Sequence, residues 1–223
     1  MRILELTLPV SDVPTVAAYF RDVLQLPVDH DRVRIGWSTL HLVPAADMPV
    51  GGVHLAFNVP DNRFAAAEAW LRERAPLQQG SDGTTWFALE SSWQSQSVYF
   101  TGPDELVLEL IGRKRLPASA QDGAFHGSEL ICLSEVGLPS TDVAATQAAV
   151  EACFGLQPLS AASPQFAPMG DDEGLLILVD AGRRWFPEGR LLPTAAGLRV
   201  RLGDVAAGAV LDAPVQGWHV SSR

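Results

Sequence analysis

The chain has 223 residues, of which 47% are hydrophobic and 19% are charged, a balance typical of a globular protein with a real core rather than a disordered tail. The formal net charge of -10 argues against nucleic acid or an anionic membrane as a partner, because both favour a basic surface. No apolar run approaches the roughly 20 residues of a spanning helix, and the first residues lack a signal-peptide pattern, so we expect a cytoplasmic protein.

The first part of the chain predicts a strand, a helix and a hairpin. Residues 2–10 alternate, so that Leu4, Leu6 and Leu8 share one face while Glu5 lies on the other. Ser11 and Asp12 are suitable caps for a helix whose apolar residues recur at the spacing of one helical face. Two short strands, at about 32–36 and 38–44, complete this first module.

The same order of elements begins again after Gly51-Gly52. We expect a strand at 53–59, a helix capped by Asp61, and strands near 84–89 and 97–109, with a turn at Gly102-Pro103. Two modules of strand, helix and sheet therefore follow one another within about the first 112 residues.

The second half of the chain repeats the first. An offset of 130 aligns Glu135 with Glu5 and Asp142 with Asp12, which indicates an internal repeat. It predicts a helix at 142–154 and strands at 175–179, 197–202 and 218–221. We therefore expect a complete two-module domain at 1–112, a charged and then Ala/Ser/Gly-rich linker at 113–126, and a shortened two-module domain at 127–223.

Four predicted strands of the first half each carry one metal-ligand type of side chain on the face opposite the leucines: Glu5, His41, His54 and Glu109. Alone, Glu5 is better explained as a solvated edge residue, and either histidine as a hydrogen-bonded core residue. Together, two imidazoles and two carboxylates form a donor set suited to a divalent transition metal, whose charge would offset the cost of burying the acids. The pattern predicts a metal site.

Three stretches resemble the vicinal oxygen chelate superfamily, which includes glyoxalases, bleomycin-resistance proteins and extradiol dioxygenases. They are Leu4 to Asp12, Gly52 to Phe57, and Ser97 through Pro103-Asp104 to Leu110. The resemblance implies an α+β fold in which tandem βαβββ modules form cup-shaped mixed sheets, with flanking helices, around a metal. In this chain the second half would be a degenerate and truncated copy.

The resemblance also implies ligands on the first and last strands of each module, which here are Glu5 and His41, then His54 and Glu109. In metal-dependent glyoxalase I the four corresponding ligands resemble this set but follow the order His, Glu, His, Glu. The first pair is therefore exchanged in this chain. We expect Zn, Ni, Mn or Fe, and a catalytic carboxylate that is either Glu109 or Glu5.

The second half departs further from the resemblance. Glu135 remains, but Ile177 and Arg199 stand where the first half has its two histidines, and no acid stands in the place of Glu109. We expect this half to bind no metal in the same manner, and to cap, stabilise or gate the first half or to replace a partner subunit. The protein would be a monomer or a homodimer.

The leading functional hypothesis is a metal-dependent enzyme of the glyoxalase type, a lyase or isomerase that moves a proton on a small substrate chelated through adjacent oxygens. One alternative is a metal-free small-molecule-binding protein of the bleomycin-resistance kind. An extradiol dioxygenase with ferrous iron ranks lower. For that reaction the resemblance implies two histidines and one carboxylate in the second domain, whereas here the ligands lie in the first and include an extra acid. Further candidates for substrate contact are Thr7, Trp37, Thr39 and Asn58, while residues 185–187 are a lid or an aromatic anchor.

Overall fold

Four modules follow one another in the computed structural model, which describes residues 1–223. The first comprises β1 (Arg2–Val10), α1 (Val13–Asp22), β2 (Val28–Asp29), β3 (Arg32–Ile35) and β4 (Ser38–Pro44). The second comprises β5 (His54–Val59), α2 (Phe64–Arg72), β6 (Phe87–Leu89), β7 (Ser95–Thr101) and β8 (Val107–Arg113). The third comprises β9 (Cys132–Ser140), α3 (Val143–Phe154), β10 (Phe166–Asp171) and β11 (Gly174–Asp180), and the fourth β12 (Arg199–Gly203), β13 (Val210–Ala213) and β14 (Trp218–Ser222). The predicted α+β fold of tandem modules is confirmed, and the last module lacks a helix.

Two of the three α-helices begin at acidic caps, whereas α2 follows a short 3-10 helix at Asp61–Arg63 and has no side-chain cap, so the expected cap at Asp61 is wrong. The Asp12 carboxylate accepts a hydrogen bond from the Thr15 amide at 2.9 Å, and Asp142 does the same for Ala145 at 3.0 Å. Each helix then buries one apolar stripe against a sheet. In α1 that stripe is Val16, Ala17 and Phe20, and in α2 it is Phe64, Ala67, Trp70 and Leu71.

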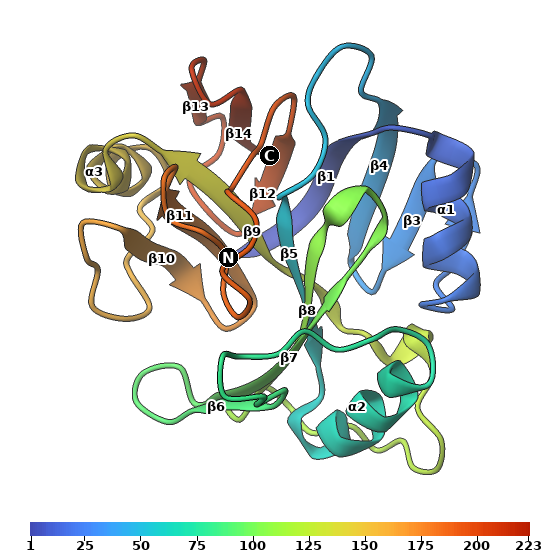
Figure 1. The fold of residues 1–223 in the computed structure, drawn as a ribbon. Coiled ribbons are helices and arrows are strands. Elements are labelled where there is room, and N and C mark those ends of the chain that lie inside the picture. Colours follow the sequence, from blue (N-terminus) through green and yellow to red (C-terminus); the bar gives the residue numbers. More distant parts are fainter.

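The strands form two seven-stranded sheets, and the modules pair in a nested order (Figure 1). The outer sheet has the order β13-β14-β12-β1-β4-β3-β2 and joins the first module to the fourth. The site sheet has the order β10-β11-β9-β5-β8-β7-β6 and joins the second module to the third. The joins are antiparallel contacts of opening strands, β1 with β12 and β5 with β9.

This pairing corrects the expectation that the two modules in residues 1–112 share one metal-binding cup. The opening strands of the first three modules carry similar alternating patterns, so the sequence pattern alone does not say which pair will meet. The linker prediction also changes at its start, since Arg113 is the last residue of β8 and is fully buried, whereas residues 114–126 contain no helix or strand.

A single large core lies behind both sheets. It takes in the leucine faces of β1 and β5, including Leu6, Leu8, Leu55 and Phe57, together with the apolar faces of all three helices. The opposite faces of the two sheets are therefore free to carry polar side chains. None of the helices has the length and apolar character needed to cross a bilayer.

Candidate metal centre and pocket

Three neighbouring strands of the site sheet bring one histidine and two glutamates together. His54 begins β5, and Glu109 and Glu135 lie on β8 and β9, which flank it. The strand register sets both glutamates opposite Ala56. Because Ala56 is two residues beyond His54, all three polar side chains project from the same face.

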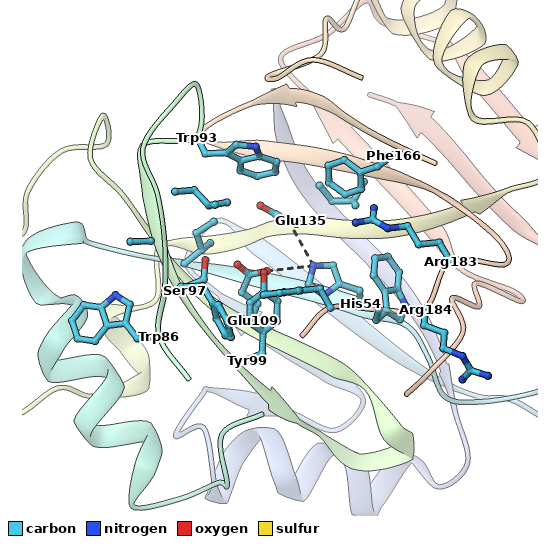
Figure 2. A pocket seen from close by; sticks show the side chains of 17 residues that line it. His54, Trp86, Trp93, Ser97, Tyr99, Glu109, Glu135, Phe166, Arg183 and Arg184 are labelled. Atoms are coloured by element: carbon cyan, nitrogen blue, oxygen red, sulfur yellow. Dashed lines mark ion pairs between the residues drawn. The ribbon is translucent and has the colours of Figure 1, made fainter. Parts of the chain in front are cut away.

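The donor atoms of the three side chains lie close enough together to bind one metal ion (Figure 2). His54 Nε2 lies 3.5 Å from Glu109 Oε2 and 3.7 Å from Glu135 Oε2. On the other side of the ring, His54 Nδ1 is 3.1 Å from the carbonyl oxygen of Val107, which can only accept, so Nδ1 carries the proton. Nε2 then faces the two carboxylates and can bind either a metal ion or, in its absence, a second proton.

A buried arginine, Arg113, fixes the position of the Glu135 carboxylate. Arg113 Nη2 donates to Glu135 Oε1, which leaves Oε2 directed at His54. The Arg113 side chain has no exposed surface, and its guanidinium lies 5.6 Å from the ring centre of Trp93. A buried charge is costly unless it is paired, so Arg113 and Glu135 depend on each other.

Burial and mutual repulsion make this cluster retain protons. Burial, and then the charge of Glu135, raise the pKa of Glu109 to about 7. Burial alone would lower the pKa of His54, but its hydrogen bond to Glu135 and the charges of both glutamates outweigh burial and raise it. Burial, followed by the charge of Glu109, raises the pKa of Tyr99 well above its usual value.

The cluster lies in a pocket of about 470 Å³ with aromatic walls (Figure 2). This volume suits a small organic ligand. The segment 183–186 and strands β6 and β7 supply much of the lining. The lining residues are His54, Trp86, Phe87, Ala88, Leu89, Trp93, Ser97, Tyr99, Glu109, Ile111, Glu135, Phe166, Ile177, Arg183, Arg184, Trp185 and Phe186.

Solved structures of similar shape identify the fold. A Bacillus subtilis protein provisionally named a dioxygenase covers 100% of this chain, and 85% of its own length, at a TM-score of 0.62 and 16% identity. Glyoxalase I from Zea mays covers 99% of this chain and 91% of its own length, at a TM-score of 0.57 and 16% identity. This chain has the vicinal oxygen chelate fold. No family model and no curated protein matches the sequence.

The donor set of this chain fits a divalent metal ion. One atom from each of His54, Glu109 and Glu135 lies within 4.8 Å of the others, and all three residues are buried. Two carboxylates side by side in the interior repel each other, and a dication would remove that cost. The imidazole already has the tautomer that a metal ligand needs, with its remote nitrogen bound to a backbone carbonyl.

The structure separates the four residues that the sequence proposed as ligands. His54 and Glu109 come together, but Glu5 and His41 lie on β1 and β4 of the outer sheet. There Glu5 is half-exposed and pairs with Arg201 at 3.4 Å. The cause is the nested pairing, which places the first and second modules in different sheets within the vicinal oxygen chelate fold.

Sequence reasoning missed Glu135 and Arg113 as members of the site. Glu135 gave a usable signal, because the repeat aligns it with Glu5, one of the expected ligands. Arg113 gave none, since it stands in the run Arg113-Lys114-Arg115, which is typical of an exposed linker. Of the residues 185–187, Trp185 is an anchor: it is buried, donates to the Gly52 carbonyl at 2.7 Å, and lies 5.0 Å from the His54 ring.

None of the other candidate contact residues lines the pocket. Thr7, Trp37 and Thr39 lie on or next to strands of the outer sheet, where the Trp37 ring lies 4.6 Å from the Arg2 guanidinium. Asn58 is on β5 but is fully buried, and its side-chain amide donates to the Asp172 carbonyl at 2.8 Å. These positions are explained by packing and hydrogen bonding.

Proposed function

We propose that the protein is a metal-dependent enzyme that binds a small organic substrate through two adjacent oxygens and transfers a proton on it, in the manner of a glyoxalase. The observation that supports this most is the buried cluster of His54, Glu109 and Glu135 in a pocket of ligand size. The proposal replaces the ligand set expected from sequence, with Glu135 in place of Glu5 and His41.

These three residues would hold the ion and leave room for a substrate. The fourth equivalent position, on the last strand of the third module, is Ile177, which lines the pocket but has no donor atom. Three protein ligands are typical of a catalytic site, which keeps positions open for substrate or water. A bound divalent ion would act as a Lewis acid and stabilise negative charge on the substrate oxygens.

The two carboxylates have different surroundings and so different roles. Glu135 is held by Arg113, which fixes one of its oxygens and supplies a permanent positive charge. Glu109 has no arginine of its own, and its pKa of about 7 lets it both accept and release a proton near neutral pH. We assign proton transfer to Glu109 and anchoring to Glu135.

Metal binding by matched histidine variants tests the proposal. Protein purified without chelators should contain a divalent metal, or take one up when titrated with Ni, Zn, Mn or Fe. His54→Ala should weaken that binding by at least about a hundredfold, because it removes a direct ligand. His41→Ala should leave it unchanged, since His41 lies in the outer sheet. Absence of metal binding, or equal effects of the two substitutions, would refute the proposal.

A metal-free binding protein is the second candidate. The aromatic lining of the pocket supports it, because such walls retain flat organic molecules without any chemistry. Ligand binding without metal uptake would favour this alternative. The dioxygenase hypothesis gains no support from the donor set, because one histidine and two carboxylates differ from the two-histidine, one-carboxylate arrangement of ferrous oxygenases.

A further inference from the structure

The pocket walls are aromatic on more than one side. Phe87, Tyr99 and Phe186 form one group, with ring centres 4.6 Å apart for Phe87 and Phe186 and 5.4 Å apart for Tyr99 and Phe186. Trp93 and Phe166 form another, with ring centres 6.4 Å apart. Figure 2 shows Trp93 and Phe166 on one side of the carboxylates and Tyr99 on the other. Such faces bind flat, polarisable rings better than flexible chains.

The mouth of the pocket exposes large apolar side chains, although Trp86 packs on Phe64 and Phe186 packs on Phe87. Trp86 is 42% exposed, and Leu89 and Phe186 are each 48% exposed. All three line the pocket. Large apolar groups gathered around one opening are unusual for a monomer surface, and an apolar ligand would remove them from water.

One of the two arginines that line the pocket has neither a salt bridge nor a hydrogen bond for its side chain. Arg183 is half-buried, and its guanidinium lies 4.9 Å from the ring centre of Phe166. Its side chain makes no salt bridge and no hydrogen bond, whereas Arg113 is already paired with Glu135. In Figure 2 the Arg183 side chain reaches toward the cluster, while its neighbour Arg184 points away, and Arg184 Nη1 donates to the Arg190 carbonyl. Arg183 is thus the free positive charge available to a ligand.

We propose that the substrate is a planar aromatic acid whose ring lies between the aromatic walls and whose carboxylate, or other single anionic group, pairs with Arg183. This inference rests on the proposed function, because the adjacent oxygens of the same molecule face the His54 cluster. The charges agree with it. A dication would balance Glu109 and Glu135, so that Arg113 and Arg183 leave the site positive and favour an anion.

Binding of three probes to the zinc-loaded protein tests the proposal. The probes are 3,4-dihydroxybenzoate, which has a ring, adjacent oxygens and a carboxylate; catechol, which lacks the carboxylate; and glycolate, which lacks the ring. Calorimetry should give an affinity for 3,4-dihydroxybenzoate about tenfold or more above that for either of the others. Equal affinities for 3,4-dihydroxybenzoate and catechol would overturn the role of the anion, and equal affinities for 3,4-dihydroxybenzoate and glycolate the role of the ring.

A matched pair of variants locates the anion. Arg183→Gln should weaken 3,4-dihydroxybenzoate binding about tenfold and leave catechol binding unchanged, whereas Arg34→Gln, on the exposed face of the outer sheet, should change neither. Equal effects of the two substitutions would overturn the assignment. The outcome is separable from that of the proposed function. Metal uptake without preference for the aromatic acid contradicts this inference alone, and Arg183-dependent binding of the acid without uptake of Ni, Zn, Mn or Fe contradicts the enzyme proposal alone.

Discussion

The outer sheet and the site sheet carry equivalent glutamates with opposite environments. Glu5 and Glu135 align in the internal repeat, and each occupies the opening strand of its module. Glu135 is 3% exposed and lies opposite Ala56, next to two other possible ligands. The side chain of Glu5 is 46% exposed and lies opposite Arg201, with which it forms an ion pair. The same repeat position thus yields a buried site residue or a surface residue.

What covers each sheet explains the difference. In the site sheet, the walls around the cluster come from the loop that carries Trp185 and from β6, β7 and β10. In the outer sheet, Arg34, Arg199 and Arg201 are exposed, and no aromatic wall stands over them. An acid can be buried only where partners compensate for lost water, and in this chain those partners exist on one sheet alone.

The largest expected difference between the sheets concerns their arginines. Arg113→Gln leaves Glu135 buried without its partner, so we expect the free energy of unfolding to fall by about 3–5 kcal/mol. Arg34→Gln, on the exposed face of the outer sheet, should change it by less than about 0.5 kcal/mol. Urea denaturation of both variants measures the two values. Similar values would show that the buried pair does not distinguish the sheets.

The glutamates should differ in how they couple stability to pH. The folded protein raises the pKa of Glu109 to about 7 from an ordinary value of 4.5, so the folded state binds this proton more tightly than the unfolded state. Stability of the metal-free protein should therefore fall as pH rises from about 5 to about 7, by about 1–3 kcal/mol. The raised pKa of His54 acts in the same direction, because its contribution is lost as pH rises.

Two substitutions test whether Glu109 is the source of this pH dependence of stability. Glu109→Gln should remove most of the pH dependence between about pH 5 and 7, and Glu5→Gln should leave it intact. The carboxylates with lowered pKa, such as Asp12 and Asp82, titrate at more acidic pH and do not contribute in this window. Thermal melts across the pH range test the prediction, and a wild-type profile retained by Glu109→Gln would contradict it.

The smallest expected effect is that of the outer ion pair. Glu5 and Arg201 are 46% and 47% exposed in their side chains, so water and salt screen their attraction. A double-mutant cycle with Glu5→Gln and Arg201→Gln should give a coupling energy below about 0.5 kcal/mol. A coupling of several kcal/mol would mean that the outer sheet carries a supported polar site of its own.

The sequence predicted local structure well because each element leaves a local pattern. The alternation at 2–10 and the cap at Asp12 correspond to β1 and α1, and the face on which Glu109 lies was also predicted correctly. The pairing of modules leaves no such pattern, because it joins strands distant in sequence. For this reason the sequence pattern predicts first-module partners for His54 and Glu109, and it predicts no metal in the half that contains Glu135, although the repeat aligns Glu135 with a candidate ligand.

The nested pairing also sets an order in which the two sheets can be completed during synthesis. Every strand of the site sheet lies between His54 and Asp180, so that sheet has all its strands once this stretch has been made. The outer sheet pairs Arg2 with Gly203 and must wait for almost the whole chain. Closing so long a loop is entropically costly, and the outer sheet can therefore be completed only on a molecule whose site sheet already has every strand available.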